Sequence, residues 1–326
     1  MSAGICLLNR NGVVLAADSA VTIGNHATVF NSANKVHKMS DSNPVGAVIY
    51  SNACFESIPF EIIISDYRKY LGAKHFDDLD EYVDDFISFI ESKSDEYGHE
   101  DNEVLYLNRI LNDVFCIIKN KQKKLLKDKN ELEECDYDAI VSEILGEIEN
   151  FKTKDSLSLS DNIEKHKQKF AQDYSANPEF SEFGLQRIFK IIDESCELMK
   201  SDYEVSGYVG IAVCGFGNKN IFPKCKHILL LGVCNGKINY RIKDNISINA
   251  KTVESILPLA QSDVMTTFLF NTNVDSLNNL KVIIKNKASQ QISSYIANKT
   301  ENELEEMFEN LSKEIVNDYI EELKNK

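Results

Sequence analysis

The chain has 326 residues, of which 43% are hydrophobic, and a formal net charge of -15 from 51 acidic and 36 basic side chains. This length and apolar content suffice for one large core, or for a core with a sizeable insertion. An acidic surface repels a phosphate backbone, which argues against nucleic-acid binding. Apolar runs are far shorter than the roughly 20 residues of a membrane span, and no export signal opens the sequence, so we expect a cytoplasmic protein without a membrane segment.

The first part of the chain is typical of β-strands. Two apolar runs, Gly4–Leu8 and Val13–Ala17, flank the dipeptide Asn11-Gly12. Asn-Gly between apolar runs predicts a tight hairpin, because both residues tolerate the positive φ that such turns require. A third run, Val45–Tyr50, is short and apolar and predicts a buried strand.

Residues 58–205 are predicted to be helical, because glycine is scarce there and apolar residues recur at helical spacing. Two such sets are Tyr82, Phe86, Phe89 and Ile90, and Leu107, Ile110, Leu111, Val114, Phe115 and Ile118. The charged stretch Lys119–Glu134 is expected to project into solvent or to form a helical hairpin, and Asp155–Asp161 is expected to be a loop. The acidic run Asp77–Glu81 lacks the register of a calcium-binding EF-hand and indicates the N-terminus of a helix instead.

Strand patterns return after Val205. The runs Tyr208–Gly217 and Lys226–Val233 are predicted strands, and Asn235-Gly236 is predicted to turn the second into Lys237–Ile242. Helices are expected from about residue 252 to the end of the chain. The order strands, helices, strands, helices favours an α+β protein over a parallel sheet built from βαβ units.

The eight cysteines contain neither a C-x-x-C pair nor a zinc-type spacing with histidine, so we expect reduced, mostly buried thiols. The sequence also lacks a glycine-rich nucleotide-binding motif that opens a helix. Neither a metal nor a cofactor is therefore expected.

The segment Gly12–Thr22, followed by Asn34–Met39, resembles the opening of a proteasome β subunit, a member of the N-terminal-nucleophile (Ntn) hydrolases. In that family a hairpin ends in an aspartate, here Asp18, and a lysine, here Lys35, starts the next strand. Later segments resemble the second sheet and first core helix of a bacterial proteasome-like branch; they are Gly215–Gly217, Phe222-Pro223, Ile228–Val233 and Ile256–Val264. The resemblance covers about half of the chain.

The resemblance implies a four-layer αββα sandwich. Its core would comprise residues 1–57 and 206–326, interrupted by a helical insertion subdomain over 58–205. The family closes this core with two further strands, whereas the apolar spacing from 302 to 326 is helical.

The resemblance also implies a catalytic site. The nucleophile falls on Ser2, where the family usually has threonine, and removal of Met1 would free an α-amine with a pKa of about 8 to act as general base. Lys35 would lie beside the Ser2 hydroxyl and lower its pKa, and Asp18 would pair with Lys35 and orient it. Backbone N–H groups near Ser51 would form the oxyanion hole.

The implied function is hydrolysis of peptide or other amide bonds, with a peptide or protein substrate and no cofactor. A small-molecule amide is an alternative substrate. By analogy the chain would form a homo-oligomer and could work with an ATPase or another protein partner. The alternative from a different class is a catalytically inactive proteasome-like subunit that serves as an assembly or partner-binding module. The helical C-terminal pattern favours this alternative, whereas Asp18 and Lys35 favour the enzyme.

Overall fold

The first two strands form the hairpin that the Asn-Gly turn predicts. In the computed structural model, which describes residues 3–260 except 20, 24–27, 31–33, 56, 128 and 130, β1 (Ala3–Asn9) pairs antiparallel with β2 (Gly12–Ala17). The side chain of Asn9 accepts hydrogen bonds from the backbone N–H groups of Asn11 and Gly12, which fixes the turn. On its other edge, β1 pairs antiparallel with β12 (Glu254–Ala260) and completes a three-stranded sheet.

The strand β12 corrects the prediction that helices resume at about Thr252. Its residues alternate between buried and exposed positions, with Leu257 and Leu259 buried and Ile256 exposed. A short apolar run does not distinguish a strand from a helix by periodicity alone, and the pairing with β1 decides the outcome. Pro258 is tolerated because β12 lies at the edge of the described sheet. The remainder of the predicted C-terminal helices, 261–326, lies outside the described residues.

A second, five-stranded antiparallel sheet has the order β11-β10-β9-β6-β5. Its strands are β5 (Val36–Lys38), β6 (Val45–Ser51), β9 (Val209–Gly215), β10 (Lys224–Cys234) and β11 (Lys237–Ser247). The predicted turn between β10 and β11 is confirmed, since Asn235 and Gly236 have φ values of 47° and 77°. Two short hairpins add β3 (Val21–Ile23) with β4 (Thr28–Phe30) and β7 (Cys54–Phe55) with β8 (Ile58–Pro59).

The helices all lie between β8 and β9 in the described chain, as the apolar spacing predicts. They are α1 (Phe60–Leu71), α2 (Leu79–Ser92), α3 (Ser94–Tyr97), α4 (His99–Leu125), α5 (Glu134–Glu149), α6 (Asp161–Ala176), the 3-10 turn η1 (Ser181–Phe183) and α7 (Gly184–Met199). Every residue of the two predicted helical stripes is buried. The charged stretch after residue 119 ends α4 and leads into α5, and the expected loop before Asp161 is present. Among the described residues, no helix is both long enough and apolar enough to cross a membrane.

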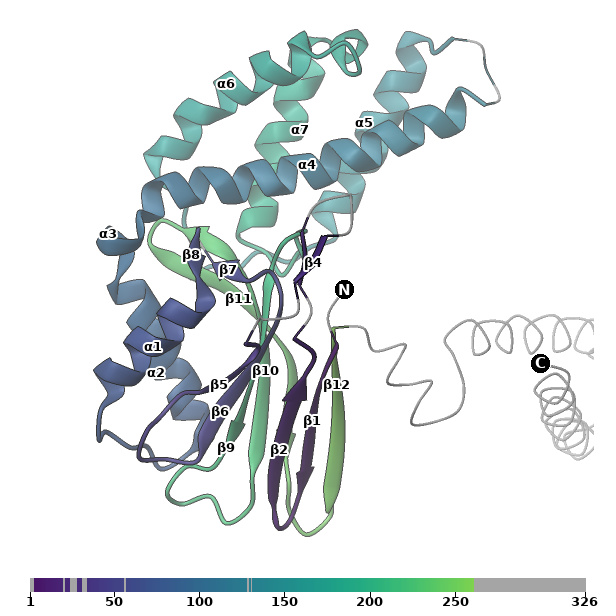
Figure 1. The fold of residues 1–326 in the computed structure, drawn as a ribbon. Helices are drawn as coiled ribbons and strands as arrows, with labels where there is room; N and C mark the ends of the chain where they lie inside the picture. The colour runs from purple at the N-terminus through teal and green to yellow at the C-terminus, as the bar shows by residue number, and fades with distance from the viewer. Residues whose placement is uncertain are drawn as a thin grey trace, which may run out of the picture. The chain divides into compact units, whose positions relative to one another are not determined.

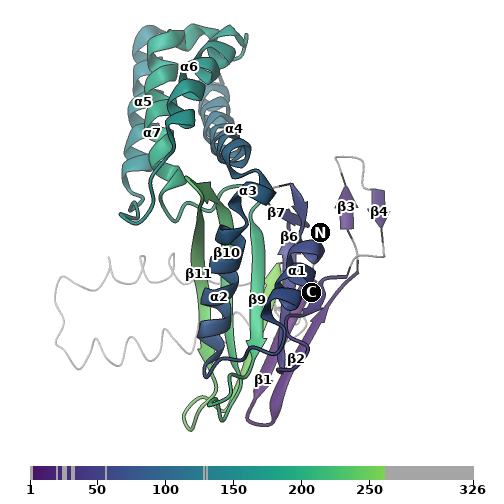
Figure 2. The same cartoon turned by 90° about the vertical axis from the view of Figure 1, so that its left-hand side faces the viewer.

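The predicted insertion divides into two groups of helices with different roles. Helices α1 and α2 cover one face of the five-stranded sheet and share a hydrophobic core with it, whereas the three-stranded sheet covers the opposite face (Figures 1 and 2). Helices α4 to α7 form a bundle at one end of the sheets (Figure 1). The described architecture is therefore α+β, with the layers helix, sheet and sheet and a separate helical bundle.

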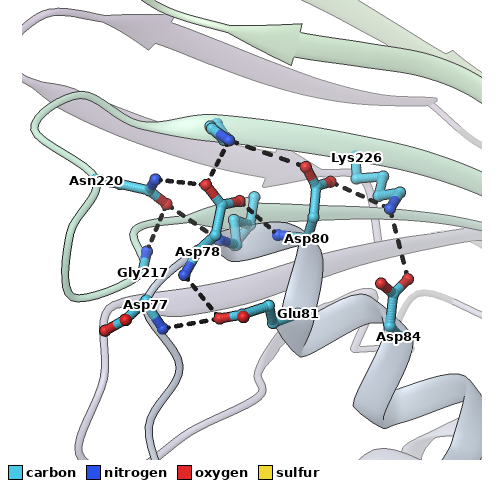
Figure 3. Close-up of polar contacts among 10 residues, drawn as sticks. Asp77, Asp78, Asp80, Glu81, Asp84, Gly217, Asn220 and Lys226 are labelled. Atoms are coloured by element: carbon cyan, nitrogen blue, oxygen red, sulfur yellow. Dashed lines mark hydrogen bonds and ion pairs between the residues drawn. The ribbon is translucent and has the colours of Figure 1, made fainter.

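The acidic run before α2 anchors this helix to the sheet. Asp78 caps the helix by accepting from the backbone N–H of Asp80 at 2.9 Å, and Glu81 completes the capping box (Figure 3). Asp78 also pairs with Lys224 of β10 at 2.6 Å, and Asp80 pairs with Lys226 at 3.1 Å. Lysines thus neutralise the carboxylates, and the predicted helix N-terminus is confirmed at this position.

The bundle is joined to the sheet through buried polar groups. Glu103 of α4, which is 1% exposed, accepts hydrogen bonds from the backbone N–H of Asn235 at the β10–β11 turn and of Ser160 before α6. Asn239 of β11 is fully buried and donates to the Tyr106 hydroxyl at 3.2 Å. Because buried polar groups are costly to leave unpaired, these bonds fix where α4 crosses the sheet.

Candidate functional site

The ion pair between Asp18 and Lys35 joins the two sheets at the ends of their strands. Asp18 directly follows β2 of the three-stranded sheet, and Lys35 directly precedes β5 of the five-stranded sheet. Lys35 Nζ lies 2.8 Å from Asp18 Oδ1, and the two side chains are 9% and 33% exposed. The ammonium is thus almost fully removed from solvent, a position in which a charge requires a close counter-charge.

Backbone hydrogen bonds hold both partners in place. The Asp18 N–H donates to the Ala3 carbonyl at 2.9 Å, while the Asp18 carboxylate accepts from the Ala3 N–H at 2.9 Å. The N–H of Ile49 donates to the Lys35 carbonyl at 2.9 Å, which extends the β5–β6 pairing to Lys35. Asp18 therefore contacts both the lysine ammonium and the backbone at the start of β1. Ser2, the predicted nucleophile, lies outside the described residues.

Ser51, the predicted oxyanion-hole position, ends β6 in an unusual backbone conformation. Its φ is 72°, in the left-handed region that residues other than glycine seldom adopt. It pairs with Val209 across the sheet and lies two residues beyond Ile49, which corresponds to about 7 Å along an extended strand. The next N–H, that of Asn52, donates to the Tyr208 carbonyl at 3.2 Å. Left-handed backbone of this kind is often found at functional sites.

A cavity of about 320 Å³ lies beside Asn52, the residue that follows Ser51. It is lined by Asn52, Cys54, Phe55, Ser57, Leu105, Asn108, Arg109 and Gly207. The lining combines the apolar side chains of Phe55 and Leu105 with amide, hydroxyl and guanidinium groups. Part of it comes from α4, so the helical bundle contributes directly to the walls of this cavity.

Arg109 fixes α4 beside this cavity. Its guanidinium donates to the carbonyls of Gly207 at 3.0 Å and Leu231 at 2.7 Å, and it lies over the Tyr106 ring at 5.3 Å. The Tyr106 ring in turn covers Gly232 of β10 so closely that an added Cβ there would lie 2.3 Å from it. Sequence reasoning missed this wall, because only the fold brings α4 and Asn52, the residue after β6, to the walls of one cavity.

The space between the two sheets holds further titratable side chains that sequence reasoning did not single out. Tyr50 Oη lies 2.8 Å from His227 Nε2, and His227 Nδ1 lies 2.7 Å from Asp244 Oδ2. A neutral imidazole with its proton on Nδ1 satisfies both contacts. Burial lowers the pKa of His227 even though Asp244 works in the opposite direction, and burial raises the pKa of Tyr50.

Three of the eight free cysteines also meet between the sheets. The thiols of Cys6, Cys214 and Cys225 lie within 4.8 Å of one another. Cys6 and Cys214 are more than 200 positions apart along the chain, so no local sequence spacing could indicate the cluster.

Comparisons with known proteins identify no family for the chain. The sequence matches no protein-family profile, and a search of curated proteins finds no match.

Proposed function

We propose that this chain is an N-terminal-nucleophile hydrolase that cleaves peptide or other amide bonds with Ser2 after removal of Met1. The observation that carries the proposal is the contact of Asp18 with both the buried Lys35 ammonium and the Ala3 N–H. Ala3 is bonded directly to Ser2, so the proposed nucleophile is attached to the backbone group that Asp18 holds.

Each group in this corner has a chemical role in the proposed reaction. The Ser2 hydroxyl oxygen attacks the substrate carbonyl carbon while the free Ser2 amine takes the hydroxyl proton. The Lys35 ammonium favours the developing alkoxide, and Asp18 keeps that ammonium charged and oriented. The amine then gives its proton to the leaving nitrogen as the amide bond breaks, and water hydrolyses the resulting ester. Backbone N–H groups near Ser51 would stabilise the tetrahedral oxyanion.

The layers of the described chain support the corresponding fold. An Ntn hydrolase is an αββα sandwich, and helices α1 and α2, the five-stranded sheet and the three-stranded sheet supply three successive layers. In this assignment α1 and α2 belong to the sandwich, and the inserted subdomain is reduced to the bundle of α4 to α7.

The cavity beyond Ser51 is proposed as the pocket for the substrate side chain next to the cleaved bond. Its wall from α4 would let the bundle contribute to substrate selection, which the minimal family fold lacks. We propose a peptide substrate, a cytoplasmic location and a homo-oligomer, with an ATPase or another protein as a possible partner. Substitution Asn108→Trp should narrow the pocket and shift preference toward peptides with smaller side chains, measured as kcat/KM across a fluorogenic peptide series.

The proposal is tested with tagless protein assayed on a library of fluorogenic peptide amides. Ser2→Ala should abolish hydrolysis, Ser2→Thr should retain it, and Lys35→Met should lower kcat by about 10² to 10⁴. Lys38→Met is the matched control, since Lys38 is exposed and pairs with Asp41 at 3.4 Å on the surface. Circular dichroism confirms that each variant is folded. Equal activity of wild type, Ser2→Ala and Lys35→Met would overturn the proposal and favour an inactive, partner-binding subunit.

A further inference from the structure

The cysteine cluster between the sheets has the arrangement of a metal-binding site. Cys6 lies on β1 of the three-stranded sheet, whereas Cys214 on β9 and Cys225 on β10 lie directly opposite each other in the five-stranded sheet. Their exposed fractions are 0%, 1% and 0%. All three sulfur atoms lie within 4.8 Å of one another, so the thiols from both sheets converge on one point.

The distances fit a single ion bound by three sulfurs. An ion about 2.3 Å from each of three thiolates in a plane holds the sulfurs about 4 Å apart. The three sulfurs lie within 4.8 Å of one another, so a shift of less than about 1 Å brings them to the separation of a bound ion. Thiolate is the form of cysteine that binds metals.

We propose that Cys6, Cys214 and Cys225 bind one Cu(I) ion in trigonal coordination. Soft thiolate ligands select Cu(I) and zinc among the common cellular metals. Zinc in structural sites takes four ligands, and the group of ligand atoms found in the described part of the chain contains three. The neighbouring His227 does not supply the fourth, since Asp244 and Tyr50 occupy its two ring nitrogens.

Two other uses of the cluster make different predictions. A disulfide between Cys214 and Cys225 would employ only two sulfurs and leave Cys6 without a role. Three thiols serving only as small apolar core residues would bind no metal with measurable affinity. The convergence of three sulfurs from two sheets favours the metal, because the ion would join the sheets at the centre of their interface.

Binding at this depth is coupled to folding. Each coordinating thiol loses its proton to solvent as a copper–sulfur bond forms, and the buried ion stabilises the folded chain by mass action. The proposed site is independent of the hydrolase, since neither Asp18 nor Lys35 contributes a ligand. Loss of metal binding and loss of hydrolysis are therefore separate outcomes.

The test uses the full chain, reduced and anaerobic, titrated with Cu(I) as its acetonitrile complex against bathocuproine disulfonate. The wild type should take up one Cu(I), and X-ray absorption should show three sulfur neighbours at about 2.3 Å. Cys6→Ser, Cys214→Ser and Cys225→Ser should each weaken binding by at least about 100-fold, more than the loss of an outer hydrogen-bond partner. Cys196→Ser is the control, because Cys196 is equally buried but donates to the Ile192 carbonyl in α7.

Several results would overturn the site. These are an absence of Cu(I) uptake by the folded wild type, unchanged affinity in all three variants, nitrogen or oxygen neighbours in the absorption spectrum, or tighter binding of Zn(II) added as its chloride than of Cu(I). A Cys214–Cys225 disulfide found by mass spectrometry in the protein as isolated, before reduction, would do the same. The absorption measurement needs only the wild type, so the proposal remains testable if a serine variant fails to fold.

Discussion

Both faces of the five-stranded sheet are buried, but they contain different chemistry. On the face that meets α1 and α2, the centre is aliphatic, as Ile49, Ile211 and Ile228 lie side by side on three neighbouring strands. On the face that meets the second sheet, Tyr50, Cys214, Cys225 and His227 occupy positions of the same strands. The centre of the first face therefore supplies apolar packing, whereas the second face holds the tyrosine, histidine and cysteine side chains described above.

This difference explains where function can be built in such a fold. Residues on one strand alternate between the faces, so an aliphatic face can secure the sheet while the other face tolerates polar groups. Polar side chains on the second face are satisfied by one another, as in the contacts of His227 with Tyr50 and Asp244. The Asp18–Lys35 pair lies where the same two sheets end, which places the proposed catalytic corner in the same interface.

The largest effect is expected on the aliphatic face. Ile211→Ala should lower the free energy of unfolding by about 2 to 5 kcal/mol, because Ile211 is fully buried and the cavity cannot be refilled by the packed helices. The measurement is urea unfolding followed by circular dichroism. Val14→Ala on β2 is the control, since Val14 is 60% exposed and should change stability by less than about 0.5 kcal/mol. Equal costs at the two positions would contradict the assigned core.

On the polar face, Gly210→Ala should cost about 1 to 3 kcal/mol through overpacking. A Cβ on Gly210 would lie 2.2 Å from the Tyr50 ring. The cost should shrink when Tyr50 is also replaced by leucine, which a double-mutant cycle measures. If Gly210→Ala cost the same free energy of unfolding with tyrosine and with leucine at position 50, the contact between the Tyr50 ring and Gly210 would be contradicted.

Tyr50→Phe should remove about 1 kcal/mol of stability without changing the packing of the ring. The lost hydroxyl contacts His227 Nε2 at 2.8 Å in the buried interface. Tyr70→Phe provides the comparison, because Tyr70 is 55% exposed. Thermal unfolding of both variants distinguishes the buried hydrogen bond from a general effect of removing a tyrosine hydroxyl.

The smallest expected effect is a dependence of stability on pH. Burial lowers the pKa of both His227 and His37 below the ordinary value of 6.5. As the pH falls, the two histidines are therefore protonated in the unfolded chain before they are protonated in the folded chain. Their neutral forms contribute fully to the free energy of unfolding above about pH 6.5, and this contribution is lost as the pH decreases below that value. His227→Gln should reduce the decrease in the free energy of unfolding between pH 7.5 and pH 5.5, which urea unfolding at the two pH values measures. An equal decrease in the variant and the wild type would contradict a buried neutral imidazole at His227.

Sequence patterns predicted those parts of the fold in which local physics dominates. The Asn11-Gly12 turn and the helical stripes of α2 and α4 follow from backbone preference and apolar spacing. The run Ile256–Ala260 was too short to specify its own structure, and pairing with β1 made it a strand. A tertiary contact thus overrode the local pattern.

The candidate site was predictable in part for the same reason. Asp18 and Lys35 are close in sequence and follow a recognisable hairpin, and the structure places them 2.8 Å apart, while their catalytic roles stay predictions. The cluster of Cys6, Cys214 and Cys225 depends on how two sheets pack together. No residue spacing within one segment predicts this cluster, because its three cysteines come together only when the two sheets pack.

The most direct test of the hydrolase is the intact mass of the full chain expressed without an N-terminal tag. The account predicts a single species that lacks Met1, begins at Ser2 and gains the mass of an acyl group when treated with a peptide β-lactone, with no such gain for Ser2→Ala. Retention of Met1 in the folded protein, with no acylation at residue 2, would contradict it.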